Sequence, residues 1–287
     1  MGKRKVAMPS FGEIFRRIRT SKNYTIDDLA SATVSKSAIS RFERGEGELS
    51  FSKVIYLLGR LHVSSEEFLL LSKADEIKKA SGKNFSQMIL SGDCSELRSQ
   101  IDSLQSQLNQ EFDQFTYLNL IMFEYQYGKL TDQAISENKI ADLVDYLFSC
   151  EFWTYYELTL FGNTLEAIPF DTCMLLSKEL NKKSHLLEQN RQHFETLINV
   201  LENIALMSLH LNRTEDTKAI LTIVKGFNMD ETYLLERAIL MYVEGNILRR
   251  ENNPLGEEKI KKSITIFKNA ESLHFYEMIT DHLSKIE

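Results

Sequence analysis

The 287-residue chain carries 34 basic and 41 acidic side chains, a formal net charge of −7, and only three prolines and twelve glycines. Leucine, lysine, glutamate and isoleucine are abundant, and the scarcity of helix-breaking residues predicts an almost wholly helical, all-α chain. The length exceeds the usual size of a single hydrophobic core, so two domains are expected.

Several protein classes are excluded at this level. No run of about eighteen apolar residues is present to span a membrane, and the basic N-terminus lacks the apolar segment of a signal peptide. Cys94, Cys150 and Cys173 are odd in number and form no C-x-x-C motif. They therefore favour reduced thiols of a cytoplasmic protein over metal ligands or a disulfide framework.

The charge is unevenly distributed along the chain. Residues 1–72 hold twelve lysines and arginines against eight aspartates and glutamates, a balance of +4, which leaves −11 for the remainder. A basic segment joined to an acidic body is typical of a polyanion-binding module attached to a part that must not bind polyanions. Chance segregation gives the same pattern, so charge alone does not decide between the two.

Five short helices are predicted within residues 1–72. Thr25, Ser35 and Ser64 suit N-cap positions, and Glu67 completes a capping box with Ser64. Gly45 follows the third helix, where a glycine commonly ends a helix. Apolar residues at helical spacing predict a shared core. The residues expected in this core include Leu29, Ile39, Phe42, Phe51, Leu57, Leu58, Leu61, Phe68 and Leu71.

The segment TVSKSAISRFERG, residues 33–45, places small hydroxyls and basic groups on one side of the third predicted helix and Ile39 and Phe42 on the other. With Leu29, Ala30 and the closing segment 61–68, this layout resembles the five-helix helix-turn-helix domain of XRE-type repressors. Its turn before the third helix is one residue shorter than the usual pattern and lacks the usual glycine. The resemblance implies that the third helix enters the major groove of double-stranded DNA.

The resemblance also assigns roles to the polar residues. Contact at or near base edges is expected from Lys36, Ser37 and Arg41. Phosphate contact is expected from Arg16, Arg17, Ser35 and Ser40. Arg44 is either a DNA contact or an ordinary solvated charge, and Ser35 is also a helix cap. For Arg19 and Glu43, the resemblance implies an internal ion pair between the third helix and the first.

After residue 72, apolar residues recur at helical spacing almost to the end of the chain. Residues 73–84 are interpreted as a hinge and residues 85–287 as a regulatory and dimerisation domain. Short connections between many antiparallel helices predict an α-solenoid of helix pairs that resembles tetratricopeptide (TPR) repeats. The predicted helices span residues 74–91, 93–109, 111–128, 132–149, 151–168, 170–182, 187–211, 214–227, 230–250, 255–271 and 273–286.

An aromatic block over residues 146–163 is the most informative part of this region. Trp153, Tyr156 and Leu160 share one helical stripe, which is most simply a core stripe. Gly162 inside a helix costs about 1 kcal/mol relative to alanine, so either a close helix approach or a ligand is expected there.

The short glycine-free turn, the string SKSAISRFERGE, the pattern LFS-x-x-x-W-x-Y-Y-E-x-x-L-x-G-N and the chain length together resemble the Rgg (Rgg/GadR/MutR) family of transcriptional regulators. The resemblance implies a homodimer with an N-terminal DNA-binding domain and a helical-repeat domain. In members that act in quorum sensing, the concave face of that repeat domain receives a short signalling peptide.

In this resemblance Asn163 matches a polar position of the peptide groove. Glu166 stands where some relatives have a basic residue, and its charge predicts a neutral or basic ligand rather than an acidic peptide. The other groove candidates are Asn199, Asn203, Tyr125, Tyr155 and Tyr233. For the asparagines, a solvated stripe or a helix–helix hydrogen bond is an equally good interpretation. For the tyrosines, a core position is the alternative.

We therefore expect a cytoplasmic, sequence-specific transcription regulator that binds an inverted-repeat DNA site as a homodimer and is controlled by a signalling peptide, with RNA polymerase as a candidate partner. Two alternatives stay open: a DNA-binding regulator that senses stress, a metabolite or a protein, and a repeat-domain interaction scaffold. No enzyme is expected, because the six histidines form no HExxH spacing and no phosphate-binding loop or nucleophile motif occurs. The same absence of motifs predicts neither a metal nor a cofactor.

Overall fold

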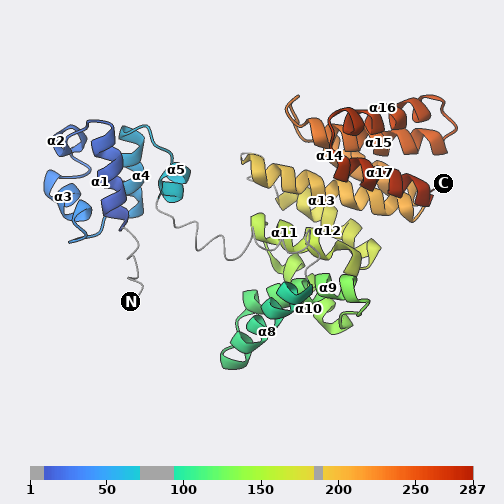
Figure 1. Ribbon diagram of the computed structural model, residues 1–287, viewed down its shortest axis with the longest axis horizontal. Helices are drawn as coiled ribbons and strands as arrows, with labels where there is room; N and C mark the ends of the chain where they lie inside the picture. Colours follow the sequence, from blue (N-terminus) through green and yellow to red (C-terminus); the bar gives the residue numbers. More distant parts are fainter. Residues whose placement is uncertain (1–9, 72–93, 184–189, 287) are drawn as a thin grey trace. The chain divides into compact units, whose positions relative to one another are not determined.

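The computed structural model describes residues 10–71, 94–183 and 190–286. Every regular element in these ranges is a helix (Figure 1), which confirms the predicted all-α fold class. Contacts between Cα atoms divide the chain into two compact units, residues 1–92 and 93–287. The predicted hinge and the predicted helix 74–91 lie outside the described residues.

The described residues of the first unit, called here the DNA-binding unit, form five helices, and three of these begin after the predicted caps. The side chains of Thr25 and Ser35 accept hydrogen bonds from backbone amides in the first turns of their helices, and Ser64 and Glu67 form the expected capping box. Gly45 ends the third helix with φ +69°, a backbone conformation that favours glycine. The helices are α1 (Phe11–Ser21), α2 (Ile26–Leu29), α3 (Lys36–Glu43), α4 (Phe51–Arg60) and α5 (Ser65–Leu71).

The predicted core forms with two corrections. Leu29, Ile39 and Phe42 are buried together with side chains of α1, α4 and α5. Phe51 is 75% exposed and Leu71 is 57% exposed, so the expectation that both are core residues was wrong. Phe51 is the first residue of α4 and Leu71 the last of α5. Helical spacing continues to an element's end, but the neighbouring helices of this unit do not cover either end.

The glycine-free turn between α2 and α3 closes without strained backbone. The amide of Ser31 donates to the carbonyl of Val34 at 3.0 Å, and the Ser31 hydroxyl accepts from the amide of Thr33 at 3.2 Å. Val34 is buried beneath the turn. No residue of the turn has a positive φ, and this is why glycine is not required there.

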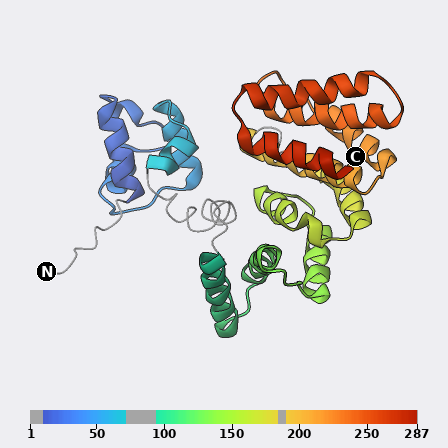
Figure 2. The ribbon, with the colours of Figure 1, turned by 45° about the vertical axis from the view of Figure 1, so that its right-hand side comes forward.

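The second unit, called here the sensor unit, stacks helix pairs into the expected solenoid of TPR-like pairs (Figures 1 and 2). Helices α9, α11, α13 and α15 pack on one another in that order and form what we call the first-helix layer. The second helices of the pairs, α12, α14 and α16, follow α11, α13 and α15 in the chain. The helices are α8 (Cys94–Gln110), α9 (Gln114–Thr131), α10 (Glu137–Ser149), α11 (Tyr155–Thr164), η1 (Leu165–Ala167), α12 (Phe170–Lys183), α13 (Arg191–His210), α14 (Thr214–Lys225), α15 (Leu234–Arg250), α16 (Leu255–Asn269) and α17 (Leu273–Ile286).

Helix α9 begins and ends three residues later than the predicted helix 111–128. Gly128 lies inside α9, and a Cβ atom there would stand 2.2 Å from the carbonyl oxygen of Gln133. The glycine therefore serves the close return of the chain after the helix. The helix ends instead at Asp132, whose φ of +56° lies in the left-handed region.

Helix α11 is shorter than the predicted helix 151–168. Thr154 and Glu157 form a capping box that starts α11 after Trp153, and residues 165–167 form a separate 3₁₀ turn. Trp153 is therefore not on the same helix as Tyr156 and Leu160. Its ring is nonetheless buried, with its indole nitrogen donating to the carbonyl of Leu147 at 3.2 Å.

Candidate nucleic-acid interface and ligand face

Helix α3 is fixed to α1 by a buried ion pair. Arg19 donates from Nε and Nη2 to the two carboxylate oxygens of Glu43 at 2.6 and 2.8 Å, and from Nη1 to the carbonyl of Tyr24 at 2.6 Å. The hydrogen bond to Glu43 raises the pKa of Arg19 against the opposing effect of burial. The two-pronged geometry holds α3 at one rotation about its axis, so the face opposite Ile39 and Phe42 is the one presented to solvent.

The eight residues predicted to contact DNA lie on α1, on α3 or at the ends of α3. Seven of them are exposed and Ser40 is half-buried. The eight are Arg16, Arg17, Ser35, Lys36, Ser37, Ser40, Arg41 and Arg44. The fold thus gathers every one of them on two adjacent helices.

Several of these side chains have intramolecular partners at the surface. Lys36 pairs with Asp27 of α2 at 2.7 Å. Arg44 donates to the carboxylate of Glu46 at 2.7 Å, and the Arg41 guanidinium donates to the Glu46 carbonyl at 3.3 Å. Exposed pairs of this kind contribute little to stability, so a phosphate oxygen or a guanine can replace these acceptors at small cost.

The seven candidate groove residues all lie on the first-helix layer or at its helix ends. Tyr125 is on α9, Tyr155 and Asn163 are on α11, and Glu166 is on η1. Asn199 and Asn203 lie one turn apart on the exposed side of α13, and Tyr233 directly precedes α15. Adjacent helices therefore present these side chains, although the residues come from positions more than a hundred apart in the chain.

At Glu166 the structure adds a partner that the sequence did not indicate. Lys129 of α9 pairs with the Glu166 carboxylate at 2.5 Å, and the Tyr125 hydroxyl donates to the same carboxylate at 3.3 Å. Burial, followed by the nearby Glu166 charge, raises the pKa of Tyr125, which keeps its hydroxyl a donor. The charge of Glu166 is thus balanced locally. Lys129 was not among the predicted groove residues, because its pairing with a residue 37 positions away is visible only in the fold.

Asn163 sits next to this group, but its side chain is already engaged. Its amide nitrogen donates to the carbonyl of Thr159 at 2.7 Å within α11. Its backbone carbonyl accepts from Gln126 of α9 at 2.6 Å. The amide oxygen of Asn163 is the remaining acceptor for a ligand. We define the ligand face as Tyr125, Lys129, Asn163, Glu166, Asn199 and Asn203.

The other two tyrosines have packing roles. Tyr155 stacks on His193 of α13 with ring centroids 5.3 Å apart. Tyr233 is only 9% exposed, meets Phe194 edge to face at 5.1 Å, and lies beneath the Arg191 guanidinium at 5.0 Å. These positions correspond to the core alternative for Tyr233, whereas Tyr155 borders the ligand face.

Gly162 marks a close approach of α11 and α13. A Cβ atom at this position would lie 3.0 Å from Cγ2 of Val200, tighter than ordinary van der Waals contact. The close-approach interpretation of this glycine is therefore confirmed. The approach places α11 directly against α13, the two helices that carry Asn163 and Asn199.

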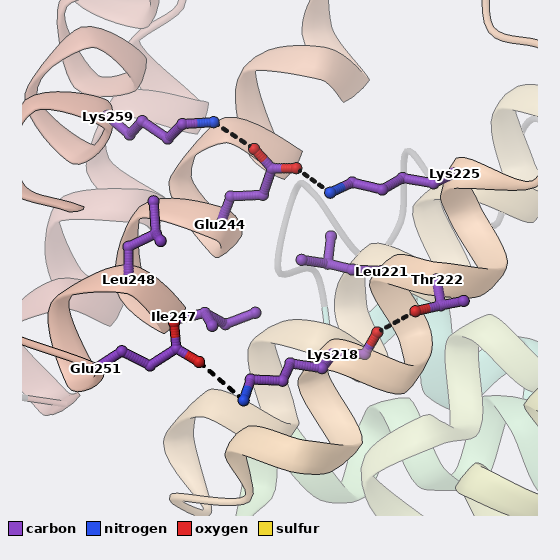
Figure 3. Close-up of a pocket in the computed structure, with 9 residues that line it drawn as sticks. All are labelled: Lys218, Leu221, Thr222, Lys225, Glu244, Ile247, Leu248, Glu251 and Lys259. Carbon is purple, nitrogen blue, oxygen red and sulfur yellow. Dashed lines mark hydrogen bonds and ion pairs between the residues drawn. The ribbon is translucent and has the colours of Figure 1, made fainter. Parts of the chain in front are cut away.

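A cavity of about 470 Å³ lies between α14, α15 and α16 and shares no lining residue with the ligand face (Figure 3). Its apolar floor is made by Leu221, Ile247 and Leu248. Ion pairs close both ends: Lys218 with Glu251 at 2.8 Å, and Glu244 with Lys225 at 2.6 Å and Lys259 at 2.5 Å. Among the described residues, no group of three or more metal-ligating side chains was found.

Comparison with known proteins identifies the family. The model of the C-terminal domain of HTH-type transcriptional regulator Rgg matches residues 102–281, well over half of the chain. The chain belongs to the Rgg family. A helix-turn-helix model matches residues 15–68, which contain α3 and most of α1. Family and fold are those of transcription regulators rather than enzymes.

Solved structures share the fold over nearly the whole chain. A cysteine variant of the SHP pheromone receptor Rgg2 of Streptococcus dysgalactiae is 25% identical, with a TM-score of 0.82 over 96% of this chain and 99% of that chain. A putative transcriptional regulator of Listeria monocytogenes has the same fold at 17% identity and a TM-score of 0.83, covering 97% of each chain. The PrgX/cCF10 complex also shares the fold, at 16% identity and a TM-score of 0.77 over 96% of this chain and 99% of that chain.

No helix among the described residues is long and apolar enough to cross a membrane. The Rgg-family chain thus combines a helix-turn-helix DNA-binding domain with the fold of the pheromone receptors, and it acts as a DNA-binding transcription regulator.

Proposed function

We propose that this Rgg-family chain is a cytoplasmic, quorum-sensing regulator whose DNA binding is controlled by a short signalling peptide held on the ligand face. The observation that carries the proposal is the ligand face itself. It combines exposed amides on α13 with a lysine–glutamate pair held between α9 and η1, and α11 packs on both α9 and α13. This surface lies on successive helices of one layer in a fold shared with a pheromone receptor.

The chemistry of this face suits an extended peptide. Asn199 and Asn203 each offer a donor and an acceptor one helical turn apart, which suits the repeating amides of a peptide backbone. Glu166 favours a neutral or basic group at its end of the face, and Lys129 offsets its charge. The ligand is therefore a peptide without an acidic side chain next to Glu166.

On DNA, two copies of the chain bind an inverted repeat. The N-terminal part of α3 enters the major groove, with Lys36, Ser37 and Arg41 at or near base edges. Arg16, Arg17, Ser35 and Ser40 hold the phosphates, with Arg44 at the edge of this surface. The sensor unit carries the dimer contact, and RNA polymerase is the partner for the regulatory output.

Peptide binding alters DNA binding only if the peptide has different affinities for two arrangements of the dimer. A peptide that spans α9, α11 and α13 contacts three helices at once. It therefore binds best at one spacing of those helices and selects one curvature of the sensor unit.

A double-dissociation experiment tests the proposal. Fluorescence anisotropy of a labelled upstream promoter fragment, at fixed low salt, reports DNA binding, and polarisation of labelled peptides from the neighbouring locus reports ligand binding. The Lys36→Ala/Arg41→Ala variant is expected to lose about ten- to a hundredfold or more in DNA affinity while keeping peptide affinity. The Asn199→Ala/Asn203→Ala variant is expected to do the reverse.

Two controls share the chemistry of these changes. Lys22→Ala removes one exposed positive charge at the end of α1, and Asn109→Ala removes an exposed amide on α8; neither is expected to change either affinity by more than a small factor. Equal DNA binding by wild type and the Lys36→Ala/Arg41→Ala variant contradicts the DNA assignment. Failure of every peptide to bind, with operator DNA present and absent, contradicts the peptide assignment.

A second candidate ligand class is supported by the cavity between α14, α15 and α16. Its volume of about 470 Å³ falls within the range of small-molecule sites, and its walls carry both lysine and glutamate. A regulator of this form senses a zwitterionic metabolite in place of a peptide. Thermal shifts with free amino acids, absent in a Lys218→Ala variant, distinguish this candidate from the peptide receptor.

A further inference from the structure

Two buried carboxylates meet where α13 packs on α15. Glu202 of α13 is 2% exposed, and neither of its carboxylate oxygens has a hydrogen-bond partner in the described part of the chain. Glu236, in the first turn of α15, is 5% exposed. Buried polar atoms in folded proteins are almost always hydrogen-bonded, so the two orphan oxygens of Glu202 call for a physical explanation.

Two neighbouring carboxylates cannot both stay ionised in a site that excludes water. Removal of the Glu202 charge from water, followed by repulsion from Glu236, raises the pKa of Glu202 well above its usual value. Glu202 is the less exposed of the two carboxylates, and no hydrogen bond from a described residue stabilises its charge. The proton therefore resides on Glu202.

No described basic group compensates Glu202, and Glu236 is the one charged residue whose field reaches it. The helices packed against α13 are α11, α12, α14, α15 and α17, and several of their other charged groups have partners of their own. These are Glu157 of α11 with Tyr146 and Thr154, Asp171 of α12 with Arg213, Lys218 of α14 with Glu215 and Glu251, and Glu244 of α15 with Lys225 and Lys259.

From α17, His282 approaches one turn beyond Glu202. Its Nε2 lies 3.0 Å from the carbonyl of Leu206, and its Nδ1 lies 2.7 Å from the hydroxyl of Tyr242. Burial is the main cause that lowers the pKa of His282, so this histidine is neutral at neutral pH. It supplies no positive charge to the carboxylate pair under those conditions.

We propose that Glu202 and Glu236 form a proton-binding pair that tightens the α13–α15 contact in acid and loosens it when both carboxylates ionise. The inference is independent of the proposed peptide, because it rests on helix packing alone. Since α13 and α15 are neighbours in the first-helix layer, a change in their contact alters the spacing of helices in the sensor unit. The ligand for this site is the proton itself.

The sign of the effect follows from which state binds the proton. Below the unfolded pKa of a glutamate, both the folded and the unfolded states hold the proton on Glu202, and its contribution to stability is constant. Above that pKa, the unfolded chain releases the proton while the folded chain retains it. Stability of the sensor unit therefore falls as pH rises, until the raised folded pKa is reached.

Urea unfolding of the full chain, followed by fluorescence of Trp153 between pH 5 and pH 8, tests this prediction. Trp153 is the chain's single tryptophan and lies buried in the sensor unit, so its signal reports that unit alone. The Glu202→Gln variant is expected to lose one proton of linkage, a difference of about tenfold in the unfolding constant per pH unit. Glu202→Met, which is apolar and of similar length, is expected to lose the same dependence and to exceed wild-type stability at pH 8.

Matched variants separate the pair from its surroundings. Glu244→Gln is the control on α15, the helix that carries Glu236. Two lysines lower the pKa of Glu244 despite its burial. Glu244 therefore titrates below pH 5, and its substitution is expected to leave the pH dependence of stability unchanged. His282→Gln removes the group whose pH dependence has the opposite sign. A histidine that is buried in its neutral form makes the folded chain less stable as pH falls below the pKa of histidine in the unfolded chain. Glu236→Gln removes the charge that repels an ionised Glu202, so the pH window of the effect moves to lower pH.

The outcomes are decisive in either direction. A pH slope that is lost in both Glu202 variants and kept in Glu244→Gln supports the proton-binding pair. Identical slopes in wild type, Glu202→Gln and Glu202→Met overturn it. A stability that follows the sodium or ammonium concentration at constant pH also overturns it, because a bound cation would then neutralise the carboxylates.

Discussion

Each unit of the molecule buries a glutamate, and the two units treat the charge in opposite ways. Glu43 in the DNA-binding unit is 4% exposed and receives two hydrogen bonds from Arg19. Glu202 in the sensor unit is 2% exposed and receives none. A paired buried charge has one favourable geometry, whereas an unpaired one makes the surrounding packing depend on protonation. The difference suits a rigid DNA-reading surface on one unit and a responsive layer on the other.

The same contrast extends to the surfaces. In the DNA-binding unit the internal partners of Arg19 orient α3, and only the exposed face of α3 carries interchangeable ion pairs. In the sensor unit, interchangeable pairs also join neighbouring elements, as Lys129 with Glu166 and Lys225 with Glu244 do, but no basic partner among the described residues orients the buried Glu202 as Arg19 orients Glu43. Shifts between helices in the sensor unit therefore exchange charge partners, while the orientation of α3 stays fixed.

The largest expected effect comes from breaking the paired charge. Arg19→Met leaves Glu43 buried without its partner, which typically costs about 3–5 kcal/mol. Circular dichroism reports both units, whereas Trp153 fluorescence reports the sensor unit alone. The DNA-binding unit of this variant is therefore expected to unfold before the sensor unit. This early transition should appear in circular dichroism and be absent from Trp153 fluorescence.

The double variant Arg19→Met/Glu43→Leu is the control for that experiment. Replacing both charges by apolar groups of similar size is often neutral, so most of the lost stability is expected to return. If Arg19→Met alone leaves the circular dichroism transition unchanged, the ion pair does not hold α3 to α1, and the comparison between the two glutamates fails.

A smaller effect is expected from a matched pair of glycines in the DNA-binding unit. A Cβ atom at Gly12 would lie 1.8 Å from the carbonyl oxygen of Phe42, whereas a Cβ at Gly59 would meet nothing within 4 Å. Gly12→Ala must push α1 away from α3 and is expected to destabilise this unit by about 1–3 kcal/mol. Gly59→Ala is expected to stabilise α4 by up to about 1 kcal/mol.

Thermal unfolding followed by circular dichroism measures both glycine variants in the full chain. Opposite signs support the view that close packing, and not only the Arg19–Glu43 pair, fixes α3 on α1. Equal shifts in melting temperature for Gly12→Ala and Gly59→Ala would show that α1 and α3 move apart without loss of stability. Helix α3 would then be held more loosely than the Arg19–Glu43 pair indicates.

The DNA-binding unit was the easier part to predict, because its signals are local. Ser64 with Glu67 and the glycine at position 45 mark helix ends within a few residues of sequence, and these features are borne out. Phe51 and Leu71 were wrongly placed in the core, because periodicity identifies an apolar stripe but not how far a neighbouring helix extends over it.

The sensor unit was harder to predict, because its important contacts join distant residues. Gly128 resembles a helix end in the sequence but serves contact with Gln133. Glu202 lies between Leu201 and Asn203 in an ordinary amphipathic pattern. Nothing nearby in the sequence indicates that α15 will cover it with a second carboxylate. The fold class was predictable from periodicity, while the charge partners required the helix packing.

The smallest effect on stability, and the sharpest effect on ligand choice, is expected at Glu166. Its pair with Lys129 is largely exposed, so Glu166→Arg should change stability by no more than about 0.5 kcal/mol. The substitution places two positive charges beside Tyr125, which should reverse the preference from neutral or basic peptides to acidic ones. Polarisation titrations with a peptide series that differs in a single charge measure this reversal.

The charge swap Lys129→Glu/Glu166→Lys restores a neutral pair and is expected to restore the original preference. If Glu166→Arg responds to every peptide as wild type does, Glu166 lies outside the ligand face. The pair between α9 and η1 then only joins those two elements, and the contrast between a fixed DNA-binding unit and a responsive sensor unit rests on Glu202 alone.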